Sequence, residues 1–256
     1  MKNFLLTGLV TVGSCLVAQA APVSEAAKSA QSAAGEYKGA VMNCDMGWCF
    51  DHMYPPIKRT MADRYASRTQ TNDQQELRRV MGLEKESNEQ AEARMKKNMA
   101  ALRQHYINMG NDMLNGGFKV ERFVIGAPYA EYELISSAGA ARAVREGSVV
   151  SQKNKNITKA EDIKWKGDRS RLVVLPTTLW ISVPDPNTGR RIRIERKDYI
   201  YAVRDEAYNR NINTRGTEPN KWYFIDSNTP VNTLRTYFPT LPLNLRTPDT
   251  GDRPLN

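Results

Sequence analysis

The apolar residues of this chain repeat with a helical period in its first half and with a strand period in its second half. The clearest helical stretch follows a capping-box pattern at Ser87-Asn88-Glu89-Gln90 and ends at Gly116-Gly117. Its apolar residues recur at steps of three and four: Ala91, Met95, Met99, Leu102, Tyr106, Met109 and Met113. This spacing predicts one long helix whose methionine-rich stripe packs in the core.

Two shorter helices are expected before the long one. Tyr54-Pro55-Pro56 interrupts the chain, and Ile57 to Tyr65 can form a helix with Pro56 in its first turn. Asn72 or Asp73 can cap a second helix, which Gly82 interrupts. The preceding segment from Pro22 to Lys38 is rich in Ala, Ser and Lys. We expect it to be either a tether or a loose start to the mature fold.

The second half consists of short runs with strand character. Asp185-Pro186-Asn187-Thr188-Gly189 is a turn signal, and Pro176 predicts a bulge or a sheet edge. The main predicted strands cover Phe118 to Ile125, Tyr129 to Ile135, Leu172 to Leu175, Leu179 to Val183, Ile192 to Val203 and Lys221 to Asp226. Helices first and hairpin-linked strands afterwards predict an α+β fold with an antiparallel sheet.

This order of elements resembles the cone-shaped nuclear transport factor two-like fold. The residues that carry the resemblance are the hairpin Leu172 to Val203 and the closing strand Lys221-Trp222-Tyr223-Phe224-Ile225-Asp226, within a region from Gln74 to Asp226. The resemblance implies that the N-terminal helices, including the long one, pack on a strongly bent antiparallel sheet. Such folds can host an enzyme in the cone pocket, usually with an Asp or His base, but a fold alone assigns no activity.

The chain divides into four predicted parts. Residues 1–20 form a signal peptide and residues 21–70 an N-terminal segment with a disulfide loop and a short helix. Residues 71–238 form the α+β domain, and residues 239–256 form a proline-rich tail. The tail is expected to be extended or disordered.

The first twenty residues predict export. Lys2 supplies a positive start, an apolar run follows from Phe4, and Ala18-Gln19-Ala20 fits the small-x-small rule for signal peptidase. The run is shorter than the roughly 20 residues that span a bilayer. We therefore expect a periplasmic or secreted protein.

A second interpretation of the leader concerns Cys15. Val12-Gly13-Ser14-Cys15 resembles the lipobox of bacterial lipoproteins, although the usual leucine at the first position is Val12. The protein would then be an outer-membrane lipoprotein, and membrane association is expected only with lipid on Cys15. The Ala18-Gln19-Ala20 site is the better match, so we favour the soluble form.

Cys44 and Cys49 are left once the leader is removed or Cys15 is lipidated. In an oxidising compartment these two cysteines are expected to form a disulfide around a short loop in which Gly47 helps the chain to turn. The alternative is a soft-metal site that adds His52 and nearby methionines. We favour the disulfide and predict no metal.

A basic excess favours an anionic partner, although Lys and Arg are spread along the chain, which favours a charge that serves solubility alone. The net charge is +9, while 8% aromatic and 25% charged residues exclude wholesale disorder. Basic residues alternate with apolar ones after the turn, which describes a strand face better than a nucleic-acid arm. Alternation puts Arg191, Arg193 and Lys197 on one side, opposite Ile192 and Ile194. With Trp222 of the closing strand, they form the predicted contact surface.

Catalytic motifs are missing from the sequence. The chain has two histidines, His52 and His105, and neither accompanies a G-x-S-x-G elbow. It also lacks H-E-x-x-H, a P-loop and G-x-G-x-x-G. We predict no catalytic residue and no cofactor.

The favoured function is a non-catalytic cell-envelope protein that binds an anionic envelope component or a protein partner, without nucleic acid. The alternative is a small-molecule-binding or hydrolytic domain that uses a cone-shaped pocket.

We expect the protein in the envelope of its native host to begin at Ala21 or at a lipidated Cys15. N-terminal sequencing and intact mass of the envelope fraction measure this directly. A full-length product that begins at Met1 and stays in the cytoplasm would contradict export, and with it the expected location.

Overall fold

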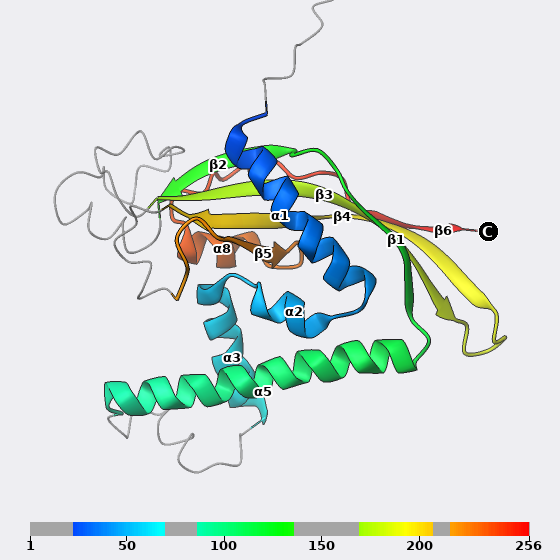
Figure 1. Cartoon of the computed structure of the whole chain (residues 1–256), viewed down its shortest axis with the longest axis horizontal. Helices are drawn as coiled ribbons and strands as arrows, with labels where there is room; N and C mark the ends of the chain where they lie inside the picture. Colours follow the sequence, from blue (N-terminus) through cyan, green and yellow to red (C-terminus); the bar gives the residue numbers. More distant parts are fainter. Residues whose placement is uncertain (1–22, 70–85, 136–168, 207–215, 256) are drawn as a thin grey trace, which may run out of the picture.

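The described residues fold into five helices and one open, six-stranded antiparallel sheet, which confirms the predicted α+β class (Figure 1). The computed structural model describes residues 23–69, 86–135, 169–206 and 216–255. The helices are α1 (Glu25–Met42), α2 (Met46–Asp51), α3 (Pro55–Thr69), α5 (Asn88–Asn115) and α8 (Val231–Tyr237). The strands are β1 (Lys119–Ile125), β2 (Ala130–Ile135), β3 (Arg169–Pro184), β4 (Arg191–Asp205), β5 (Trp222–Asp226) and β6 (Gly251–Leu255). The predicted helix that Asn72 or Asp73 would cap lies outside these ranges.

The β3–β4 hairpin is the centre of the sheet. Its register runs without interruption from Ser170 opposite Asp205 to Pro184 opposite Arg191. The turn between the strands contains Gly189 at a φ of 67°, a left-handed conformation that glycine adopts without strain. β1 and β2 pair with successive parts of β3, while β6 and β5 pair with successive parts of β4. The sheet is therefore four strands wide along its length, as β2–β3–β4–β5 at one end and β1–β3–β4–β6 at the other.

β3 passes straight through Pro176, where the sequence predicted a bulge or an edge. Pro176 lies opposite the turn between β1 and β2, so no neighbouring strand needs the N–H that proline lacks. Its carbonyl oxygen accepts a hydrogen bond from the Gly126 amide at 2.8 Å. The position is thus a local edge inside an otherwise central strand.

One face of the sheet is covered by α1, which the sequence interpretation had treated as a tether or a loose start. Ser24 caps the helix by accepting a hydrogen bond from the Ala27 amide. Ala27, Ala30 and Ala34 form a stripe of small residues that packs on the sheet. Alanine favours helix strongly and lets the backbones approach closely, so a weakly hydrophobic segment still forms a buried helix.

The opposite face is covered by α8, by the start of α3 and by the beginning of the predicted tail. Leu234, Phe238 and Leu241 pack there against the buried residues of β3, β4 and β5. The tail, expected to be extended or disordered, is extended at Gly251–Leu255, which form β6, and Leu241 near its start is buried. Pro254 is accommodated because β6 is an edge strand.

A second layer of α2, α3 and α5 lies beside the sheet (Figure 1). α5 starts with the predicted capping box, in which Ser87 and Gln90 bond reciprocally to each other's backbone amides. Leu102 of its apolar stripe packs with Phe50 of α2 and Ala62 of α3. Met95, Met99 and Tyr106 of the same stripe are partly buried against this cluster. Only the C-terminal end of the long helix reaches the sheet, through Met113. No helix within the described ranges is long and apolar enough to cross a membrane.

Replacing Leu172 with Ala should lower the free energy of unfolding by about 2–5 kcal/mol, because its side chain is 0% exposed in the main core. Leu243→Ala is the matched control, since Leu243 is 61% exposed and should change stability by less than about 0.5 kcal/mol. Denaturant unfolding measures both. Equal losses in the two variants would contradict this placement of the core.

Candidate functional site: a cationic sheet face

One face of the β1–β3–β4–β6 end of the sheet carries an excess of basic side chains. Alternation along the uninterrupted β3–β4 register puts Arg191, Arg193 and Lys197 on one side, and all three are exposed. Ile194 points to the other side, where it packs with Val120 and Ile181. We call the basic side the cationic face, formed by Lys119, Arg122, Arg191, Arg193, Lys197 and Arg253.

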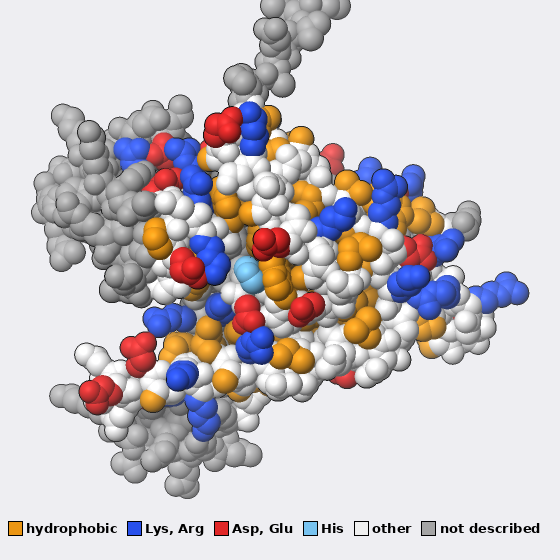
Figure 2. All heavy atoms as spheres, viewed as in Figure 1, with side chains coloured by type: hydrophobic (Ala, Val, Ile, Leu, Met, Phe, Trp, Pro, Cys, Tyr) orange, Lys and Arg blue, Asp and Glu red, His pale blue; other side chains and the backbone are white. Residues whose placement is uncertain are grey.

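Cross-strand pairing arranges this face in three successive rows. The first row holds Lys119, Ser182, Arg193 and Leu255, from β1 to β6. The second row holds Arg122, Trp180, Glu195 and Arg253. The third row holds Val124, Thr178, Lys197 and Gly251. Figure 2 shows Lys and Arg side chains at the right-hand end, where Figure 1 places the β3–β4 turn, β1 and β6, and others at the left among Asp and Glu side chains.

Some of these cations are already held by the fold. Arg193 Nε lies 3.1 Å from Glu121 Oε1, and Arg253 Nη2 lies 2.8 Å from Glu195 Oε2. Arg191 donates to the Ser182 hydroxyl and to the carbonyl oxygens of Ser182 and Gly117, which ties the hairpin to the end of α5. Arg191 and Arg193, both predicted as contact residues, therefore also stabilise the fold.

Other cations of the face have no carboxylate partner in the part of the chain that the structure describes. Lys119 and Lys197 are both exposed and unpaired. The Arg122 guanidinium stacks on the Trp180 ring, 4.8 Å from its centroid. The sequence interpretation identified Lys197 but missed Lys119 and the Arg122–Trp180 stack. The basic residues of β1 could not be assigned to this face before their pairing with β3 was known.

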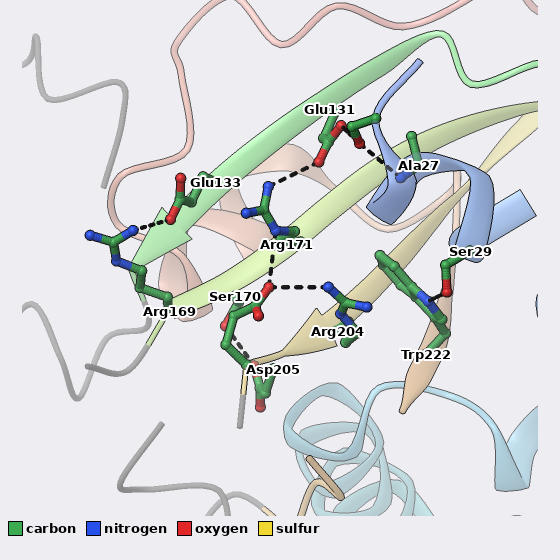
Figure 3. Close-up of polar contacts among 12 residues, drawn as sticks. Ala27, Ser29, Glu131, Glu133, Arg169, Ser170, Arg171, Arg204, Asp205 and Trp222 are labelled. Carbon is green, nitrogen blue, oxygen red and sulfur yellow. Dashed lines mark hydrogen bonds and ion pairs between the residues drawn. The ribbon is translucent and has the colours of Figure 1, made fainter. Parts of the chain in front are cut away.

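Trp222 does not belong to the predicted contact surface. It is 6% exposed and lies under α1, where its Nε1 donates to the Ser29 hydroxyl at 3.0 Å. The Arg204 guanidinium lies 4.8 Å from the indole ring (Figure 3). β5 pairs with the Ile200–Arg204 end of β4, so Trp222 is at the opposite end of the sheet from Arg193.

Around Trp222 the charges neutralise one another. Arg171 lies 3.0 Å from both Glu131 and Glu206. Arg204 also pairs with Glu206, and Arg169 pairs with Glu133 (Figure 3). The Ser24 hydroxyl donates to Glu131, which joins the start of α1 to β2. With one Glu for each Arg, this network holds strands and helix together and presents little net charge to a ligand.

Cys44 and Cys49 are free thiols, so the predicted disulfide is absent from the structure. The residues between them form the start of α2, because Asp45 caps it by accepting from the Trp48 amide. Gly47 packs closely against Ile107 instead of turning the chain back. Burial, together with the nearby negative charge of Asp45, raises the pKa of the Cys49 thiol to about 12, so the thiol stays protonated.

The metal interpretation also lacks a ligand set. The His52 ring stacks on Trp48 at 3.7 Å between centroids, and its Nδ1 lies 3.0 Å from the Trp48 carbonyl oxygen. No group of three or more His, Cys, Asp or Glu side chains within the described ranges could hold a metal ion. Cys15 lies outside those ranges.

Asp205 is a buried carboxyl at the end of β4. It is 0% exposed, and its oxygens accept hydrogen bonds from Ser170 and Thr217 at 2.5 and 2.7 Å. The Tyr54 hydroxyl lies 3.5 Å away. Burial raises the pKa of Asp205, while the two shorter hydrogen bonds lower it by stabilising the carboxylate, and burial is the larger effect. Sequence reasoning did not single out this residue among 28 acids.

Comparison of the chain with protein-family models, curated proteins and solved structures finds no match. The resemblance to nuclear transport factor two-like proteins stays a prediction.

Asp205→Asn should change the pH dependence of stability in a defined direction. A raised pKa in the folded state means that wild type loses stability as the pH rises from the ordinary carboxyl pKa, about 4, to the raised value. Because the amide cannot titrate, the free energy of unfolding of the variant should rise relative to that of wild type over this pH range. Unfolding free energies at several pH values measure the difference. If the unfolding free energy of wild type instead rises relative to that of the variant as the pH rises, the pKa of Asp205 is lowered in the folded state.

Proposed function

We propose that this chain is an exported, non-catalytic cell-envelope protein that binds an anionic component of the envelope through the cationic face. The expectation of export comes from the leader, and the expectation of an anionic partner comes from the net charge of +9. Part of this positive charge is carried by the exposed basic side chains of the cationic face. The resemblance to cone-shaped proteins is part of the same proposal and assigns no activity.

The observation that carries the proposal is the contrast between the two ends of the sheet. At the Trp222 end each Arg has a Glu partner. On the cationic face Lys119, Arg122 and Lys197 have no such partner among the described residues, and their charges add in three neighbouring rows. Unpaired cations on one exposed face create a positive potential that attracts and retains anions.

The two histidines support a non-catalytic function. His52 stacks on Trp48, and His105 lies 5.1 Å from the Tyr65 ring. Both rings thus take part in aromatic packing of the helical layer. Neither lies near the cationic face, so an acid–base role for histidine at that surface has no support.

The second candidate is a small-molecule-binding or hydrolytic domain, and Asp205 is the observation that favours it. A buried carboxyl with a raised pKa is a common general base or acid. Here the carboxyl is enclosed by the side chains of Ser170, Thr217 and Tyr54, which connect β3, β4 and the start of α3. These contacts describe a structural carboxyl better than one open to a substrate.

Reversing Lys119 and Arg122 to Glu should weaken retention on isolated envelopes by about tenfold or more, because each basic residue near an anionic surface contributes about 1 kcal/mol. The thermal midpoint should stay close to that of wild type, since both side chains are exposed. Co-sedimentation at low and high salt measures retention, which added salt should reduce.

The matched control reverses Lys96 and Lys97, two exposed residues of α5, and so changes the net charge equally. It should retain near wild-type binding. The cationic face is not the contact surface if retention is unchanged both by the Lys119 and Arg122 substitutions and by salt. The same holds if the two double variants weaken retention equally.

A further inference from the structure

The edge of β4 has a gap between the two strands that pair with it. β5 covers Ile200 to Arg204, and β6 covers Arg193 to Lys197. Asp198 and Tyr199 therefore lie between the two strands, with no strand partner on that side among the described residues. The Tyr199 amide donates to the neighbouring Asp198 Oδ1 at 2.8 Å rather than to another strand. The gap is built into the strand order of the sheet.

A groove of about 510 Å³ occupies this gap. Its lining includes Lys197, Tyr199, Ser227, Asn228, Thr250 and Gly251. Ser227 and Asn228 come directly after β5, Thr250 directly precedes β6, and Gly251 is its first residue. A smaller groove of about 190 Å³ shares Lys197, Thr250 and Gly251 and extends toward Arg253. Lys197 thus lines both hollows at the border of the cationic face.

Of the two acidic residues that line the larger groove, Asp252 is paired with a cation, whereas Asp198 accepts a hydrogen bond from a backbone amide and keeps its negative charge. Asp252 accepts two hydrogen bonds from Arg196, with nitrogen–oxygen distances of 2.7 and 2.8 Å. Asp198 accepts from the Tyr199 amide. Lys197 has no partner among the described residues, so its ammonium is the charge of the groove that is free to bind an anion. The other polar side chains that line the groove are hydroxyls and an amide.

We propose that this groove binds a carboxylate-bearing sugar, such as a uronic acid residue of an acidic polysaccharide. The Lys197 ammonium would pair with the carboxylate, while Ser227, Asn228 and Thr250 would hydrogen-bond the ring hydroxyls. The volume lies within the roughly 300–1,000 Å³ range of small-molecule sites and is too large for a bare anion. This inference rests on the proposed function and names the chemical class of the anionic component.

The test is a titration of the full chain with glucuronate, followed by amide chemical shifts. The Gly251 amide is the reporter, because Gly251 lines both grooves and nothing lies within 4 Å of its would-be Cβ. Glucuronate should shift this amide and saturate. Glucose, which lacks the carboxylate, and inorganic phosphate, which lacks the ring, should each bind at least tenfold more weakly.

Lys197→Gln should weaken glucuronate binding at least tenfold, since it removes the charge and keeps a side chain that can hydrogen-bond. Lys97→Gln is the matched control, because it removes an exposed cation of α5, outside both the cationic face and the groove. The control should bind glucuronate like wild type. Both side chains are exposed, and an unchanged thermal midpoint would verify that each variant folds.

Three results would overturn the inference: a Gly251 amide that does not respond, a Lys197→Gln variant that binds like wild type, or phosphate that saturates as tightly as glucuronate. Its failure can be separated from that of the proposed function. Envelope retention that depends on Lys119 and Arg122 without glucuronate binding would remove the sugar site alone. Glucuronate binding through Lys197 without envelope retention would remove the envelope partner and keep the groove.

Discussion

The uninterrupted pairing of β3 with β4 is the constraint on which the rest of the structure depends. Every other strand of the sheet pairs with one of these two, so their register decides which side chains share a row and a face. A shift by one residue would exchange the two faces of a strand, turning Leu172 or Tyr201 away from Leu234 of α8 and the basic residues toward the α1 side. The apolar side chains buried near Asp205 therefore fix the position of Lys197 at the other end of the hairpin.

The two ends of this hairpin use charge in opposite ways. Near Trp222, Arg and Glu side chains alternate and hold β2, β3, β4 and the start of α1 together. Partly buried ion pairs of this kind fix the geometry when each charge has a partner, and they contribute less to net stability than their Coulomb attraction suggests. Near Lys197 carboxylates are also present, but Lys119, Arg122 and Lys197 face solvent without a carboxylate partner among the described residues. Stability and binding are thus separated along one pair of strands.

The sequence predicted the elements whose side chains have a strong period or a strong cap. α5 and its capping box, the β3–β4 hairpin with its turn, and β5 were all found where expected. It failed where the deciding interaction is tertiary. The alanine stripe of α1 becomes informative only when a sheet is present to cover it, and β6 is a strand because β4 offers it an open edge.

The site was only partly predictable for the same reason. Alternation sufficed to group Arg191, Arg193 and Lys197, since neighbours within one strand need no tertiary information. It could not show that Glu121 neutralises Arg193 across 72 positions, or that Trp222 pairs with the far end of β4. The short loop between Cys44 and Cys49 looked like a disulfide loop. Asp45 and the contact of Gly47 with Ile107 make that segment a helix instead.

β6 determines whether the cationic face and the groove exist as described. Its first four residues are exposed, and two ion pairs with β4, Arg196–Asp252 and Arg253–Glu195, accompany its backbone pairing. The Arg196–Asp252 pair is exposed and contributes about 0–1 kcal/mol, which weakens with salt, whereas Arg253 partners the buried carboxylate of Glu195. Because most of β6 is exposed, it is held less firmly than the buried strands. Without β6, Arg196 and Glu195 would lose these partners and the gap at Tyr199 would extend along the edge to Arg193. The structure thus couples the shape of the groove to the least buried strand of the sheet, close to the end of the chain.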